Sequence, residues 1–202
     1  MDRIANLPVD HRGFKVPFFV AWVNGKPDHR IIDSNKLHAC IIKRLCWVCG
    51  DPLGVHLSFV VGPMCGINRV SSEPPQHLEC ARYAVQHCPF LTRPHMRRRE
   101  AGMPDEPVRD AAGIMLLHNP GVSLIWTTRK FSIRPQPNGI VFDLGDPESI
   151  EFWTEGRAAS RREIDESIQT GLPELLKHVK DTRERQSLLS SQMLFERLLP
   201  KE

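Results

Sequence analysis

Cysteine and histidine residues near the middle of the chain have the types and spacing of a metal site. Cys46 and Cys49 are separated by two residues and followed by Gly50, which is the form of a zinc knuckle in which the glycine eases the tight turn. Farther along, His77 and Cys80 stand three apart, so on a helix they share one face. The two pairs together offer four ligands to one tetrahedral ion. We therefore predict a zinc site at Cys46, Cys49, His77 and Cys80.

Two further cysteines are alternative ligands in this prediction. Cys88 lies eight residues after Cys80, so on an unbroken helix it would fall near the same face, two turns away. Cys65 lies between the two pairs, and either cysteine could replace His77. The first cysteine pair could instead be a redox couple or two buried thiols. The Trp-Val between its members, and the lack of a thioredoxin-like helix after it, favour metal binding over redox chemistry.

The sequence around the ligands favours a structural ion over a catalytic one. Catalytic zinc keeps three protein ligands and a water beside a carboxylate. The zinc deaminase order, His-x-Glu before Pro-Cys-x-x-Cys, is absent, and so is the His-Glu-x-x-His of metalloproteases. Glu79 is the carboxylate to consider. An enzyme would gather Glu79, Asn68, Arg69 and a histidine around an open zinc position.

A basic segment is the second candidate site. It consists of Arg93, Arg97, Arg98 and Arg99. Arginines at this density could lie along a phosphate backbone, where each neutralised phosphate releases counterions. The acidic residues Glu100, Asp105 and Glu106 follow at once, so a solvated loop that pairs its own charges is the alternative.

Composition limits the class of protein. The 202 residues are 41% hydrophobic and 25% charged, with a formal net charge of +3, as in ordinary globular proteins. No apolar run approaches the roughly 18 residues of a membrane span, and the run from Phe18 to Val23 is too short for a signal peptide. We therefore expect a cytoplasmic protein that does not contact membranes and whose six cysteines stay reduced. Without a glycine-rich phosphate loop, no nucleotide cofactor is expected.

The elements before the knuckle are predicted to be a hairpin and a helix. Val16 to Val23 and Arg30 to Asp33 are expected to be strands, and Asn24-Gly25 is a dipeptide favoured in a type I′ turn. Ser34 is expected to cap a helix over residues 35–44.

The elements that carry the ligands have the order of a treble clef. After the knuckle, His56 to Val61 is expected to form a short hairpin closed around Gly62-Pro63. Pro74-Pro75 then suit the first turn of a helix that carries the second ligand pair. Knuckle, hairpin and helix over residues 44–90 predict a treble-clef-like zinc module.

The last part of the chain is predicted to be strands followed by helices. Strands are expected over residues 113–117, 122–128, 139–144 and 150–153. Ser160 and Glu163 form a capping box for a helix, and Gly171 with Leu172-Pro173 is expected to end it. A second helix should run from Glu174 into the 190s.

These elements predict an α+β fold: a treble-clef-like zinc module between an N-terminal hairpin and a small, mostly antiparallel sheet with C-terminal helices. The expected segments are 1–45 (hairpin and helix), 46–92 (zinc module), 93–112 (basic, proline-rich linker) and 113–202 (sheet and helices), packed as one compact unit.

Short segments over most of the chain carry a resemblance to a known family. They include Cys-Trp-Val-Cys-Gly at 46–50, Gly-Pro-Met-Cys at 62–65, His-x-x-Cys-Ala at 77–81 and Val-Pro-Phe-Phe-Val-Ala-Trp at 16–22. In these the chain resembles a family of uncharacterised zinc-site proteins carried by bacteria and phages, to which no activity is assigned. The resemblance implies one natural unit of mobile-element origin.

Two functions are consistent with these features. The first is a non-enzymatic, zinc-stabilised binding protein that contacts nucleic acid or another protein. The alternative is a zinc-containing hydrolase or nuclease with a site between the zinc module and the C-terminal sheet. A closed four-ligand centre would favour the binding protein, and an open zinc position would favour the enzyme.

Overall fold

The computed structural model of the chain describes residues 3–94, 96–97 and 120–201. In chain order its elements are β1 (Val20–Val23), β2 (Lys26–Ile32), α1 (Ser34–Lys43), β3 (Leu57–Val61), α2 (Pro63–Asn68), β4 (Val70–Ser71), α3 (Leu78–His87), β5 (Ser123–Thr128), β6 (Phe131–Gln136), β7 (Gly139–Leu144), β8 (Pro147–Thr154), β9 (Arg157–Ala158), α4 (Arg161–Leu176) and α5 (Thr182–Glu196). The predicted strand over 113–117 and most of the predicted linker lie outside the described residues.

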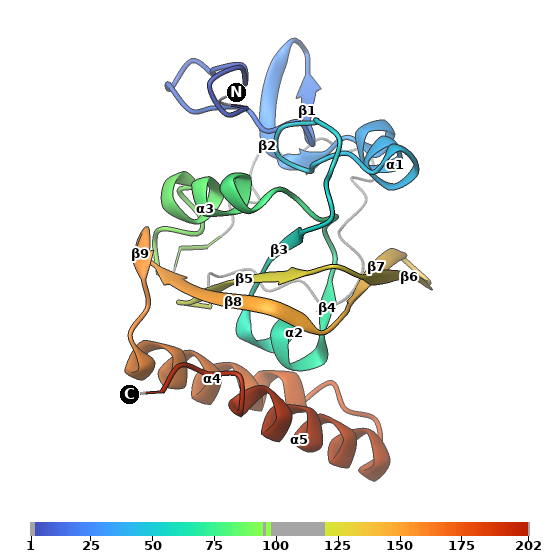
Figure 1. Cartoon of the computed structure of the whole chain (residues 1–202), viewed down its shortest axis with the longest axis vertical. Helices are drawn as coiled ribbons and strands as arrows, with labels where there is room; N and C mark the ends of the chain where they lie inside the picture. Colours follow the sequence, from blue (N-terminus) through green and yellow to red (C-terminus); the bar gives the residue numbers. More distant parts are fainter. Residues whose placement is uncertain (1–2, 95, 98–119, 202) are drawn as a thin grey trace.

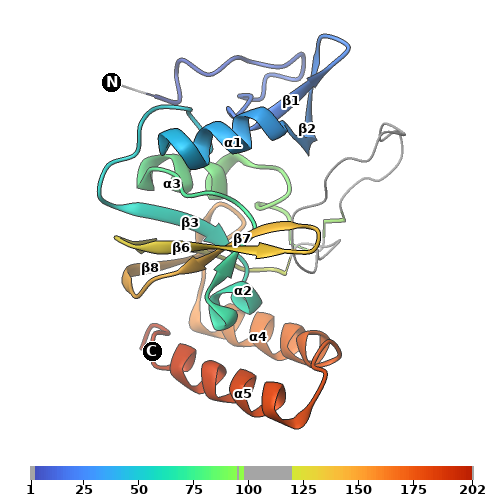
Figure 2. The ribbon, with the colours of Figure 1, turned by 90° about the vertical axis from the view of Figure 1, so that its right-hand side faces the viewer.

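The elements form layers, with β-sheets between two groups of helices (Figure 1). A four-stranded sheet has the order β3-β5-β8-β9, a three-stranded sheet has the order β4-β7-β6, and β1 and β2 form a separate hairpin. Helices α1 and α3 lie on one side of the sheets, and α4 and α5 lie on the other (Figure 2). All these strand pairs are antiparallel. The predicted α+β class with small antiparallel sheets is confirmed.

Strand β5 is the centre of the core. All six of its residues are buried, because β3 and β8 flank it and helices cover both faces of its sheet. Leu124 and Trp126 point into the main core, which α2, α4 and α5 complete. Ile125 points to the opposite face and packs against Ala81 and Val85 of α3. Because successive side chains of β5 point to opposite faces of the sheet, this one strand packs against both the main core and α3.

The N-terminal hairpin forms as predicted, around Asn24-Gly25. Both turn residues have positive φ, 50° and 75°, as a type I′ turn requires. Its first strand begins at Val20 rather than Val16, since Pro17 precedes it and the N–H of Phe18 donates to the knuckle at Val48. The hairpin leads directly into α1, which delivers the chain to the knuckle.

The N-cap of α1 is Asp33, not Ser34 as predicted. The Asp33 carboxylate accepts hydrogen bonds from the N–H groups of Asn35, at 2.9 Å, and Lys36, at 3.2 Å. A carboxylate at this position also interacts favourably with the positive end of the helix dipole. Ser34 is already the first helical residue, and its side chain is exposed.

Replacing Asp33 by alanine should therefore destabilise the protein, while the same change at Ser34 should not. Loss of an N-cap costs about 1 kcal/mol, and a surface serine within a helix is worth less than about 0.5 kcal/mol. The measurement is the urea midpoint of each variant at unchanged m-value. A larger loss in Ser34→Ala than in Asp33→Ala would restore the serine as the cap.

The predicted hairpin around Gly62-Pro63 does not form. Strand β3 pairs with β5, and α2 begins directly after it, at Pro63. Proline suits the first turn of a helix, which is the role it takes here. Ser58 also makes an antiparallel bridge to Gln76, just ahead of the second ligand pair. Strand β3 therefore pairs with β5 on one side and with Gln76 on the other, and not with the segment that directly follows it in the chain.

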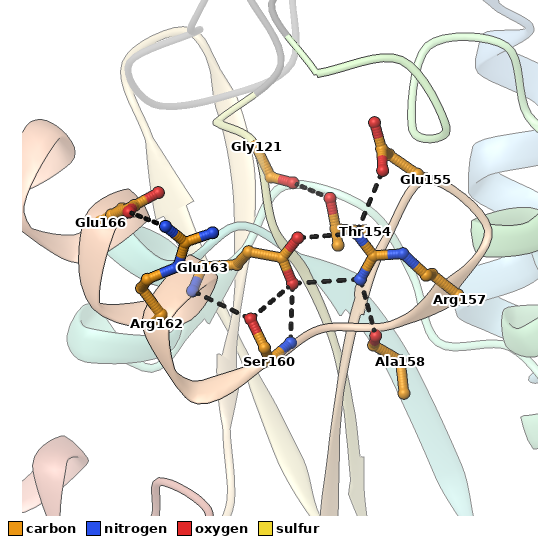
Figure 3. A network of polar contacts seen from close by, with 9 residues as sticks. All are labelled: Gly121, Thr154, Glu155, Arg157, Ala158, Ser160, Arg162, Glu163 and Glu166. Atoms are coloured by element: carbon orange, nitrogen blue, oxygen red, sulfur yellow. Dashed lines mark hydrogen bonds and ion pairs between the residues drawn. The ribbon is translucent and has the colours of Figure 1, made fainter.

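The capping box at the start of α4 is confirmed. The Ser160 hydroxyl and the Glu163 carboxylate each bond the other's backbone N–H, and Arg157 donates to the same carboxylate (Figure 3). The hydrogen bond from Arg157, together with those from Ser160, lowers the pKa of Glu163 to about 2. Nearby, the Thr154 hydroxyl donates to the carbonyl of Gly121 at 2.7 Å, which ties β8 to the start of β5. The corner between β9 and α4 is fixed by these contacts.

The predicted stop at Gly171-Leu172-Pro173 is wrong. Helix α4 continues to Leu176 with Pro173 inside it, and α5 begins at Thr182, capped by Asp181. Leu172, Leu175 and Leu176 pack against the main core, which outweighs the hydrogen bond that proline removes. Gly171 serves close packing, since a Cβ there would lie 3.1 Å from three atoms of Met64 in α2.

Candidate metal centre

Four side chains meet in one cluster between the N-terminal part of the chain and α3. Cys46, Cys49, His77 and Cys80 place one ligand atom each within 4.8 Å of all the others. Three of these residues are buried, and Cys49 is half-buried. The structure thus brings together the two pairs that the sequence spacing predicts.

The first pair lies in a tight turn after α1. The N–H of Cys49 donates to the Cys46 sulfur at 3.5 Å, and the N–H of Gly50 donates to the Cys46 carbonyl at 2.9 Å. The N–H of Cys46 in turn donates to the carbonyl of Asp51 at 2.7 Å. Gly50 has a φ of +79°, and a Cβ there would lie 2.7 Å from the Phe18 ring. Both the backbone and the packing of this turn therefore require the glycine.

The second pair comes from the start of α3. His77 is the N-cap, and its carbonyl accepts the first helical hydrogen bond, from the N–H of Ala81 at 2.9 Å. Its side chain makes no capping bond and turns instead toward the sulfurs. Cys80 lies in the first turn of the helix. The expectation that Pro74-Pro75 begin the helix is wrong, because they precede His77.

A backbone carbonyl fixes the tautomer of His77. Its Nε2 lies 3.1 Å from the carbonyl oxygen of Pro52. A carbonyl can only accept, so Nε2 carries the proton and Nδ1 keeps its lone pair. Nδ1 lies 3.4 Å from the sulfur of Cys49 and 3.9 Å from that of Cys80. Nδ1 is thus the ring atom available to a metal ion, and the Pro52 carbonyl orients the ring.

These distances fit a tetrahedral zinc ion. Bonds of about 2.3 Å to sulfur and about 2.0–2.1 Å to nitrogen place neighbouring sulfur and nitrogen ligands about 3.5 Å apart. The two nitrogen–sulfur distances lie on either side of that value. Thiolates and imidazole are ligands of zinc rather than of calcium or magnesium. The cluster can therefore hold a metal ion, and zinc is the ion that its chemistry favours.

Mutual hydrogen bonds link the three sulfurs of the cluster. Hydrogen bonds from Cys49 and Cys80 lower the pKa of Cys46. The hydrogen bond with Cys46 raises the pKa of Cys49 and that of Cys80, because it favours the thiol form of each, and the negative charge of Cys46 adds to the effect. A dication can take the place of the shared protons, so metal affinity should fall as protons compete for the sulfurs at low pH.

The alternative ligands Cys65 and Cys88 lie outside this cluster. Cys65 is on α2 and packs against the main core. Cys88 is the C-cap of α3, and burial raises its pKa, as it does that of Cys65. Cys40 of α1 does lie close to the cluster. Its burial, followed by the charges of Cys46 and Cys49, raises its pKa to about 12, so it stays a neutral thiol.

The residues expected around a catalytic ion have other partners. Glu79 is exposed and forms an ion pair with Arg3. Arg69 donates to Asp146 at 2.7 Å and lies over the Trp126 ring, 5.7 Å from its centroid. Asn68 is exposed at the end of α2. The predicted catalytic group does not gather at the metal cluster.

An open pocket of about 510 Å³ lies between the cluster and the sheet. Its lining includes His77, Val55, His56 and Glu148. His56 Nδ1 lies 2.7 Å from a Glu148 carboxylate oxygen, and this hydrogen bond lowers the pKa of Glu148. The His56 side chain is 62% exposed, so this is a surface ion pair rather than a dry catalytic pair.

Half of the predicted basic segment can be located. Arg93 and Arg97 are exposed, whereas Arg98 and Arg99 lie outside the described residues. The segment leaves α3 through a turn in which Leu91 and Thr92 donate to the Cys88 carbonyl, each at 3.0 Å. It therefore starts at the far end of the helix that carries two of the ligands.

No protein-family model, curated protein or solved structure matches the chain. The family resemblance of its short segments accordingly stays a prediction, and its function has to be argued from the site. Across the described part of the chain, none of the helices combines the length and apolar content that crossing a bilayer requires.

Three residues that lie beside the metal cluster were not predicted from the sequence. Arg3, Leu7 and Asp51 contact the ligands or their neighbours, although Arg3 and Leu7 come from the start of the chain. Their spacing to the knuckle follows no motif. The one available signal was the position of Asp51, directly after Gly50, at the edge of the turn.

Proposed function

We propose that this chain is a non-enzymatic, zinc-stabilised binding protein whose partner is nucleic acid. The observation that carries the proposal is the closed set of four buried or half-buried ligands, three sulfurs and one imidazole nitrogen. Four protein ligands complete the tetrahedron of a structural zinc ion and leave no position for a substrate or a reactive water. The module is then a treble-clef variant in which α2 and β4 replace the simple hairpin.

The surroundings of the cluster support this proposal over the hydrolase or nuclease alternative. Glu79, the nearest candidate for a general base, is neutralised by Arg3. The His56–Glu148 pair in the adjacent pocket faces solvent, where its charges are screened. Arg69 is committed to Asp146 and the Trp126 ring. A zinc ion would instead tie the turn after α1 to the first turn of α3, and so stabilise the scaffold.

The basic segment supports nucleic acid as the partner. Arg93 and Arg97 are exposed, and two more arginines follow in the sequence. Guanidinium groups pair with phosphates, and the affinity they provide comes largely from the release of counterions. Because phosphate contacts carry little sequence information, the protein should bind nucleic acids of different sequence with similar affinity.

Replacing Arg97, Arg98 and Arg99 by alanine should weaken nucleic-acid binding without changing the fold. The slope of log affinity against log salt should become shallower by up to about 2.7, since each lost phosphate contact contributes about 0.9. The measurement is fluorescence anisotropy of single- and double-stranded probes over a salt series. The matched control is Arg183→Ala, Arg185→Ala and Arg197→Ala, which removes the same charge from exposed positions of α5 or its end.

The control should keep most of the wild-type slope, because only the general field of the protein changes. Equal effects of the two triple variants would mean that net charge, not the basic segment, holds the nucleic acid. Absence of binding even at low salt, where a basic patch is strongest, would remove nucleic acid as the partner and leave a protein partner to be identified.

A further inference from the structure

The N-terminal segment, residues 3–19, lies on the same side of the molecule as α1 and α3 (Figures 1 and 2), and its residues Ile4 and Leu7 pack at the metal cluster. Leu7 is 8% exposed and forms one buried apolar group with Cys46, Val48 and Cys80. Ile4 packs against the same group. A part of the chain that supplies no ligand thus shares one apolar group with two of the four ligands, Cys46 and Cys80.

Arg3 connects this segment to both halves of the metal centre. Its guanidinium pairs with Glu79, which directly precedes Cys80, and lies 3.4 Å from the carboxylate of Asp51, two residues after Cys49. One side chain therefore holds the knuckle and the start of α3 at the same time. The contact with Asp51 lies two residues from Cys49, the half-buried ligand.

The other end of the segment is bound to the knuckle backbone. The N–H of Phe18 donates to the Val48 carbonyl at 2.7 Å, and the N–H of Phe19 donates to that of Trp47 at 3.3 Å. The rings of Phe19 and Trp47 stack with centroids 4.7 Å apart. Between the two ends, the Lys15 ammonium donates to the carbonyls of Ala5 and Leu7 and closes the segment into a loop. The segment is fixed at both ends and across its middle.

We propose that residues 3–19 form a cover that controls exchange of the bound metal, with Leu7 sealing the sulfurs and Arg3 as a positioning residue that keeps the cover closed. The inference rests on the proposed metal centre and adds to it a kinetic role for a segment without ligands. A chelator or oxidant reaches the buried sulfurs of Cys46 and Cys80 only after the end near Arg3 opens. Such local opening needs far less free energy than global unfolding, so it sets the exchange rate.

The test is the rate of zinc release to a chromogenic chelator from the zinc-loaded protein. Leu7→Ala should release zinc about tenfold faster than wild type, because the open state no longer exposes a large apolar side chain. Arg3→Ala should accelerate release about threefold at low salt, in line with a partly exposed ion pair. Raising the salt should accelerate release from the wild type toward the rate of Arg3→Ala, which should itself change little. Arg3→Lys should recover part of the slow rate.

Val9→Ala is the matched control, since it shortens an apolar side chain of the same segment that is 54% exposed. It should release zinc at the wild-type rate. Equal release rates for wild type, Leu7→Ala and Arg3→Ala, each carrying one zinc per chain, would overturn the cover while leaving the metal centre in place. If the wild type binds no zinc, the metal centre itself fails, and alkylation of the buried Cys46 by iodoacetamide still decides whether the segment shields the sulfurs. Faster alkylation in Leu7→Ala than in Val9→Ala would support the cover, and equal rates would reject it.

Discussion

Replacing Cys46 or Cys49 by serine should abolish zinc binding and unfold the centre of the chain. Serine stays protonated and is a poor zinc ligand, so either change leaves an incomplete site. Zinc binding to structural sites contributes about 10–16 kcal/mol in zinc-finger peptides, and the whole stability of a typical domain is about 5–15 kcal/mol. The loss is therefore comparable with the total stability. Inductively coupled plasma mass spectrometry should find about one zinc per wild-type chain and none in either variant, and circular dichroism should find a lower melting temperature.

Cys65→Ser and Cys88→Ser are the matched controls for this prediction. Both are half-buried thiols outside the cluster, so each variant should keep its zinc and lose at most a few kcal/mol of stability. Loss of zinc in either control would make that cysteine a ligand in place of His77. The zinc site would be rejected if the wild-type protein were fully folded without metal, or if Cys46→Ser left the melting temperature unchanged. The four side chains would then be ordinary core residues.

The members of the cluster could be predicted from the sequence because each pair depends on short-range geometry. Two cysteines separated by two residues fit one knuckle, and His77 and Cys80 fit one helical turn whatever the rest of the fold is. The same holds for the turn at Asn24-Gly25 and for the box between Ser160 and Glu163. In each case the physical cause lies within four residues.

Apart from local shifts at the starts of α1 and α3, the errors in the predicted fold involve contacts between distant parts of the chain. Strand β3 pairs with β5 instead of a neighbouring segment, and no local signal specifies that partner. Strand β6 escaped prediction because its interior is exposed and contains Pro135, a residue tolerated at the edge of a sheet. Gly171 and Pro173 are local stop signals that packing on the main core overrides. Arg3 and Leu7 also lie at the metal centre through contacts with residues distant in the sequence, which no local pattern specifies.

The second prediction with a large effect on stability concerns Phe195 of α5, a residue of the main core. Its ring is 2% exposed and meets Phe152 edge to face, with centroids 6.4 Å apart. Gly66 of α2 makes room for it, since a Cβ at Gly66 would lie 2.8 Å from the ring. Phe195→Ala removes these contacts and leaves a cavity, which costs about 3–5 kcal/mol. In a chain of this length each kcal/mol shifts the melting temperature by about 2–4 °C, so a fall on the order of 10 °C is expected.

Leu194→Ala is the control, because the neighbouring side chain is 54% exposed and its loss should change stability by less than about 0.5 kcal/mol. Tryptophan fluorescence and zinc release, followed in parallel during urea unfolding, add a test of cooperativity. Leu57 and Phe59 of β3 lie in the main core, and α3 packs on Ile125 of the adjacent strand, so the metal centre and the core share their elements. Both signals should therefore shift together in Phe195→Ala. A zinc transition that keeps its wild-type midpoint while the fluorescence transition moves would show instead that the metal centre is a separate folding unit.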